Sequence, residues 1–170
     1  MAYQSDLLLT QPWRLLTAHV VHVGWVHLVL NLSGLLLLPV IFPCFPNRRF
    51  GVIGGFSAVL LSLIFWRTLP DLYVYVGLSG VLHGWYFAAA WHALEIQQDR
   101  LIAVILLFGL TLKLAYEVFF VGQASAAWIG APVLTQAHLF GVLIALGLSV
   151  VLTVISPSCV SQSQFSPPNN

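Results

Sequence analysis

Residues 77–84 read Gly-Leu-Ser-Gly-Val-Leu-His-Gly, and they open one of the apolar stretches of the chain. Within this segment Gly80 and Gly84 are four residues apart, so they share one face of a helix. Small residues at this spacing let the backbones of two helices touch inside a membrane. A second small face, formed by Ala137 and Gly141, lies on the last apolar stretch. The two faces predict a pair of closely packed membrane helices.

The composition fits a bundle of such helices. Of 170 residues, 59% are hydrophobic and only 6% are charged, which leaves too little polar surface for a water-soluble domain. We therefore expect an all-α polytopic membrane protein whose partner is the lipid bilayer. The net charge is +1 and the basic residues are scattered, so the basic stripe that nucleic-acid binding requires is missing.

Five apolar stretches approach the ~20 residues that a bilayer requires. They are residues 26–42, 50–66, 77–94, 101–121 and 133–155. The chain is accordingly divided into a loop before the first span (1–25), a membrane domain (26–155) and a polar tail that is expected to be disordered (156–170).

The basic residues predict how these spans are oriented. Arg48 and Arg49 separate the first two spans and Arg100 separates the third from the fourth, so the positive-inside rule places all three in the cytoplasm. The first, third and fifth spans then all run from outside to inside. Polar residues at their starts share one depth near the outer face: His27 and Asn31, Ser79, and His138.

Ser79 and His138 have the chemistry of a nucleophile and its base. Gly77 and Gly80 flank the serine and permit a tight turn at the helix start, where free N–H groups favour an anion. A histidine at matching depth is suited to accept the hydroxyl proton. Since no span at that depth starts with Asp or Glu, a Ser-His dyad is expected rather than a triad.

Other polar residues are assigned roles around this dyad. His27 and Asn31 share one helical face and are expected to donate hydrogen bonds to an oxyanion. His83 follows Ser79 by one turn, where it can orient the ring of His138 or be a plain core histidine. Lys113 and Glu117, the charges inside the fourth span, are either neighbours of the site or its gate, or a mutually neutralised structural pair.

The order of these motifs resembles that of the rhomboid intramembrane serine proteases. It runs through Trp13-Arg14, His22 with His27 and Asn31, residues 77–80, and Ala137-His138 with Gly141. The resemblance implies that Ser79 is the nucleophile and His138 the base. It also implies that His27 and Asn31 form the side-chain part of the oxyanion hole. The family core has six spans, so the first span is expected to be missing from this chain.

Within the family the chain is most similar to the rhombosortase branch, through the pattern of residues 77–84 and through Lys113 and Glu117. This resemblance implies transmembrane substrate proteins with a C-terminal sorting tail made of a Gly-Gly motif, a membrane helix and a basic end. It also implies a bacterial inner membrane with the active site facing the periplasm. An amine acceptor in place of water, as in a sortase, stays open.

Two other functions remain as alternatives. A catalytically inactive rhomboid-like protein would bind client helices without cutting them. The six histidines allow a metal- or haem-ligating membrane protein, but neither His-Glu-x-x-His nor a thiolate cluster occurs. We therefore expect no metal and no cofactor.

Overall fold

The computed structural model describes residues 1–120, 126–127 and 129–155. Helices stand at all five predicted apolar stretches: α2 (Trp25–Ile41), α3 (Asn47–Thr68), α4 (Ser79–Ala93), α5 (Arg100–Phe120) and α7 (Thr135–Ile155). Within the described part of the chain, α3, α5 and α7 are long and apolar enough to cross a membrane, while α2 is a shorter apolar helix. The expected all-α polytopic membrane fold is confirmed.

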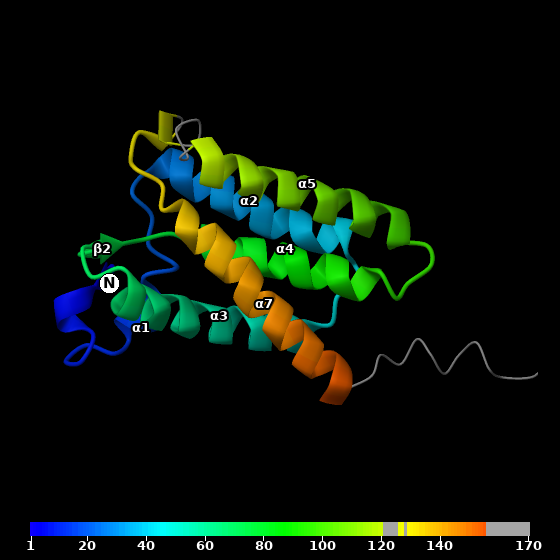
Figure 1. Cartoon of the computed structure of the whole chain (residues 1–170), viewed down its shortest axis with the longest axis horizontal. Coiled ribbons are helices and arrows are strands. Elements are labelled where there is room, and N and C mark those ends of the chain that lie inside the picture. Colours follow the sequence, from blue (N-terminus) through cyan, green and yellow to red (C-terminus); the bar gives the residue numbers. More distant parts are fainter. Residues whose placement is uncertain (121–125, 128, 156–170) are drawn as a thin grey trace, which may run out of the picture.

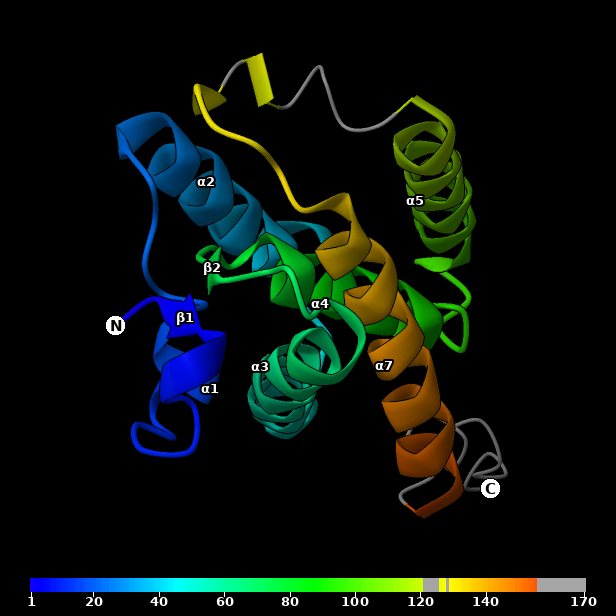
Figure 2. The same cartoon turned by 60° about the vertical axis from the view of Figure 1, so that its left-hand side comes forward.

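Helix α4 lies in the middle of the bundle, with α2, α3, α5 and α7 around it (Figures 1 and 2). Most of its residues are buried, and several of them are Gly or Ala. Small side chains let four neighbours approach the same helix. The serine of residues 77–84 is thereby placed at one end of the most enclosed helix.

The contact between α4 and α7 is made by backbone atoms. A Cβ on Gly141 would overlap the carbonyl oxygen of Gly80, and a Cβ on Gly84 would lie 2.8 Å from the carbonyl oxygen of Gly141. Ala137 and Ala145 continue the same face of α7 and are fully buried. The two small faces predicted from the sequence therefore meet, and they fix the height of α7 against α4.

Short elements precede the first long helix, where the sequence predicts only a loop. Strand β1 (Tyr3–Gln4) pairs antiparallel with β2 (Val74–Tyr75), and the 3-10 helix η1 (Ser5–Leu7) and α1 (Arg14–Thr17) follow β1. Arg14 Nη1 donates to the carbonyl oxygen of Ala2 at 2.6 Å. These contacts hold the segment that leads into α4. The predicted disordered tail, 156–170, lies outside the described residues.

Candidate active site

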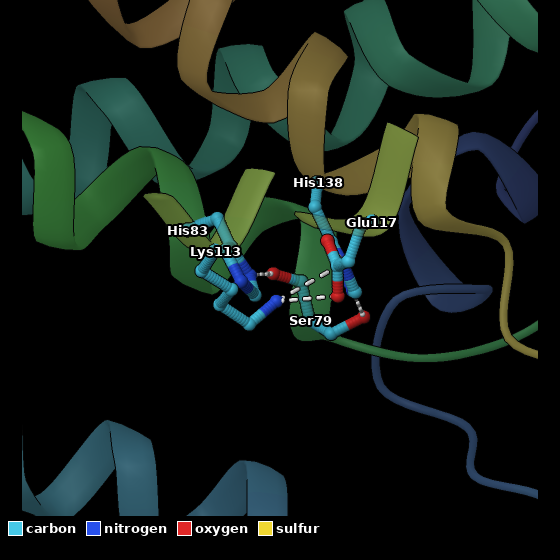
Figure 3. A network of polar contacts seen from close by, with 5 residues as sticks. All are labelled: Ser79, His83, Lys113, Glu117 and His138. Carbon is cyan, nitrogen blue, oxygen red and sulfur yellow. Dashed lines mark hydrogen bonds and ion pairs between the residues drawn. The ribbon is translucent and has the colours of Figure 1, made fainter. Parts of the chain in front are cut away.

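Ser79 and His138 meet where α4 and α7 begin. Ser79 is the first residue of α4, and His138 lies in the first turn of α7. The serine Oγ is 3.0 Å from Nε2 of His138, within hydrogen-bond reach (Figure 3). His138 is 3% exposed, whereas Ser79 is half-buried and lines a cavity. Gly80 follows Ser79 directly and Gly141 lies one turn after His138, so the close packing of these glycines brings the two side chains together.

An acidic side chain completes this arrangement from α5. Oε2 of Glu117 lies 2.8 Å from Nδ1 of His138, and Glu117 is 5% exposed. Nζ of Lys113 donates to the other carboxylate oxygen, Oε1, at 2.6 Å (Figure 3). The expectation that no acid reaches His138 is therefore wrong. The triad was excluded because no span starts with an acid at that depth, whereas Glu117 lies near the end of α5.

His83 packs against the histidine of the pair. Its ring stacks on that of His138 with centroids 4.0 Å apart and an angle of 15° between the planes. Its Nδ1 donates to the carbonyl oxygen of Ser79 at 2.6 Å, which fixes the ring at the start of α4. The structure thus places His83 where it limits rotation of the His138 ring.

The two residues expected to bind an oxyanion occupy different surroundings. His27 lines the same cavity as Ser79, and its Nδ1 is buried without a hydrogen-bond partner. Asn31 is buried below it, and its Nδ2 donates to the carbonyl oxygen of His27 at 3.1 Å. The structure therefore brings His27 to the cavity, whereas Asn31 supports the turn that carries His27.

The backbone conformation of Gly77 and its contact with His27 both require a residue without a side chain. Its φ is +129°, a conformation that residues with a side chain rarely adopt, and a Cβ there would lie 2.7 Å from Cε1 of His27. The N–H of Gly77 donates to the carbonyl oxygen of Ala18 at 3.0 Å, and Tyr75 Oη donates to its carbonyl oxygen at 2.9 Å. The tight entry predicted from the flanking glycines is present at this position.

A cavity of about 330 Å³ opens beside Ser79. Its other lining residues are mostly apolar: Val23, Leu72, Val74, Tyr75, Val76, Ile129, Ala131, Pro132, Val133 and Leu134. Tyr75 was not anticipated from the sequence, because its position depends on the pairing of β2 with β1. Burial raises the pKa of Tyr75, so its hydroxyl stays a donor. The cavity can hold an apolar segment against the serine.

The described residues form no cluster that could bind a metal ion. Nowhere in residues 1–120, 126–127 and 129–155 do three or more His, Cys, Asp or Glu side chains gather in a way that could hold a metal ion. His83 and His138 contact a backbone carbonyl group, a carboxylate and a serine hydroxyl instead. The arrangement supports proton transfer and nucleophilic attack.

Comparison with known proteins gives two matches. The rhomboid domain matches residues 9–155 of the chain. A protein of Bacillus subtilis (strain 168) named "Putative rhomboid protease YdcA" is 26% identical over 134 residues. That match covers 76% of this chain and 61% of the Bacillus protein, so the chain spans less than two thirds of its relative's length. No solved structure matches.

Proposed function

The chain belongs to the rhomboid family, since a rhomboid domain covers residues 9–155, and on that premise we propose that it is an intramembrane serine endopeptidase. The observation that carries the proposal is the 3.0 Å contact between Ser79 Oγ and His138 Nε2 at the wall of an apolar cavity. A nucleophile paired with a base in this way is the minimal apparatus for acyl transfer.

The reaction begins when Ser79 Oγ attacks the scissile carbonyl of a membrane-anchored substrate in the cavity. His138 Nε2 takes the hydroxyl proton and then gives it to the leaving amine, and water hydrolyses the acyl-enzyme. The tetrahedral oxyanion is stabilised by free N–H groups at the start of α4 and by His27. We assign the side-chain donor to His27 because it lines the cavity, and a supporting role to Asn31.

The substrate class follows from the closer resemblance to rhombosortases. Residues 77–84, Lys113 and Glu117 support a substrate with a Gly-Gly motif, a membrane helix and a basic end. Glycines suit such a cleavage site because a helix unwinds readily where they occur, and because they add no side chain beside the scissile bond. Arg48, Arg49 and Arg100 support an orientation in a bacterial inner membrane with Ser79 toward the periplasm.

The test is cleavage of a co-expressed reporter that carries such a C-terminal tail. We expect Ser79→Ala and His138→Ala to lower cleavage by a factor on the order of 10⁴ or more. Ser33→Ala, which makes the same change at an exposed serine of α2, is the matched control and should cleave normally. Cleavage that survives both site variants would contradict the protease assignment.

A second reporter separates activity from substrate class. Replacing its Gly-Gly pair by Val-Val should abolish cleavage if the enzyme requires the proposed sorting tail. Equal cleavage of both reporters would keep the protease and discard the tail preference. Binding of the reporter without cleavage, by wild type and Ser79→Ala alike, would instead indicate the inactive client-binding protein.

A further inference from the structure

Nδ1 of His138 lies between two charged groups of α5 (Figure 3). Glu117 Oε2 is 2.8 Å away and Lys113 Nζ is 3.5 Å away, while the same Nζ is 2.6 Å from Glu117 Oε1. The opposite ring nitrogen, Nε2, faces Ser79. The two charges therefore act on the side of the imidazole that does not touch the serine.

These contacts select one tautomer of the ring. Glu117 is held ionised by the adjacent Lys113 ammonium, so its carboxylate offers no proton and can only accept. The short contact to Glu117 therefore requires that Nδ1 carry the hydrogen and donate it. The lone pair is then on Nε2, directed at Ser79 Oγ, which is the form that can take the serine proton.

We infer that Glu117 is a positioning residue that holds His138 in this proton-accepting tautomer, and that Lys113 in turn holds Glu117. The inference rests on the proposed function and extends its dyad to a Ser79–His138–Glu117 triad. One proton moves from Ser79 Oγ to Nε2 and later to the leaving amine. Glu117 stays unprotonated throughout and stabilises the imidazolium that forms.

Other titratable groups near His138 do not take this role. His83, from α4, stacks on the ring face, and its Nδ1 is used by the carbonyl oxygen of Ser79. His27, from α2, faces the cavity. Neither ring donates to or accepts from Nδ1, so Glu117 is the group that sets the proton on that nitrogen, and Lys113 acts on it through Glu117.

The alternative is that Lys113 and Glu117 only neutralise each other. A positioning role and a structural pair are separated by comparing purified wild type with Glu117→Gln and Glu117→Asp. Two rates are measured across pH: kcat/KM for the reporter, and the labelling of Ser79 by a fluorophosphonate probe. We expect Glu117→Gln to lower both rates about 10²- to 10⁴-fold, because an amide can donate to Nδ1 and favour the wrong tautomer. Glu117→Asp should recover part of the loss.

The pH dependence of the two rates distinguishes the readings, because a purely structural Lys113–Glu117 pair would leave it unchanged. We expect its acid limb to shift to lower pH in Glu117→Gln, because the imidazolium loses the carboxylate that stabilises it. Glu95→Gln, at an exposed acid near the end of α4, makes the same chemical change and should alter neither rate nor profile. Lys113→Met should give a smaller loss than Glu117→Gln.

Three results would overturn the inference. The first is a Glu117→Gln enzyme with wild-type rates and profile while Ser79→Ala is inactive, which leaves the proposed function standing. The second is a pair of observations: Glu117→Gln loses both rates because it unfolds, and wild type shows no downfield Nδ1–H proton resonance from His138. The third is a wild type that neither labels at Ser79 nor cleaves, which removes the proposed function as well.

Discussion

His19 is a buried histidine outside the proposed chemistry, and it should make the stability of the fold depend on pH. It is 2% exposed, and its Nε2 lies 2.9 Å from the carbonyl oxygen of Ala58. Burial lowers the pKa of His19 to about 4, against 6.5 for the free side chain. In the unfolded chain it binds a proton as the pH falls below 6.5, whereas in the folded chain it stays neutral until about pH 4.

The free energy of unfolding should therefore fall as the pH drops through this window, by roughly 2 kcal/mol between pH 7 and pH 5. The measurement is the unfolding of purified protein in detergent at both pH values. Burial also lowers the pKa of His22, so wild type is compared with His19→Gln, which removes only the contribution of His19. Equal pH dependence of the unfolding free energy in wild type and His19→Gln would show that His19 is not the cause.

At the residue scale the sequence placed Ser79, His138 and His27 at one depth because depth depends only on span order and charge. It predicted that Glu117 neighbours the site or forms a structural pair with Lys113, but it could not connect Glu117 to His138. That contact depends on how far α5 is rotated about its axis, and α5 exposes apolar side chains on most of its circumference, so periodicity does not mark an inner face. Only Ala103 and Glu117 are buried on this helix.

At the scale of elements, the seam between α4 and α7, where Gly80 and Gly84 pack on Gly141, determines whether Ser79 meets His138. We predict that Gly141→Ala pushes α7 away from α4, because the new Cβ would overlap the carbonyl oxygen of Gly80. Overpacking of this kind costs about 1–3 kcal/mol, and a shift of about 1 Å at the site lowers catalysis on the order of 10²-fold. Reporter cleavage and thermal unfolding measure the two effects.

Gly147→Ala is the matched control on the same helix, since nothing lies within 4 Å of its added Cβ. It should keep full activity and gain a few tenths to about 1 kcal/mol from helix propensity. Wild-type cleavage by Gly141→Ala, or equal losses in both variants, would show that the seam does not set the distance between Ser79 and His138.

The positions of the helices could be predicted from the sequence, because long apolar runs bounded by charged residues mark the membrane spans. The start of α3 was placed at residue 50 and lies at Asn47, since the helix extends past the apolar run to include Arg48 and Arg49 after Pro46. The β1–β2 pair was missed because two-residue strands carry no periodicity. Their pairing also joins residues as distant in sequence as Tyr3 and Tyr75.

At the scale of the whole molecule, the predicted orientation places Cys44 and Ser79 on opposite sides of the membrane. Cys44 is exposed in the connection between α2 and α3, beside Arg48 and Arg49. In a Cys159→Ser background, a membrane-impermeant thiol reagent should label Cys44 only after the cells are permeabilised. Cleavage of substrates at the outer face requires this orientation.

A reciprocal variant calibrates the labelling. Tyr73 is 65% exposed and precedes β2, so Tyr73→Cys combined with Cys44→Ser should be labelled in intact cells. Labelling of Cys44 in intact cells, with Tyr73→Cys protected, would reverse the orientation.

The pairing of β1 with β2 has a practical consequence for anyone who handles this protein. Thr17 Oγ1 donates to the carbonyl oxygen of Met1 at 2.8 Å, and Tyr3 pairs with Tyr75, which lines the cavity beside Ser79. Residues 1–4 are thus held against the strand that lines the cavity. A bulky fusion joined directly to Met1 would strain the pairing of β1 with β2 and shift Tyr75 in the cavity wall, so a flexible linker should precede Met1.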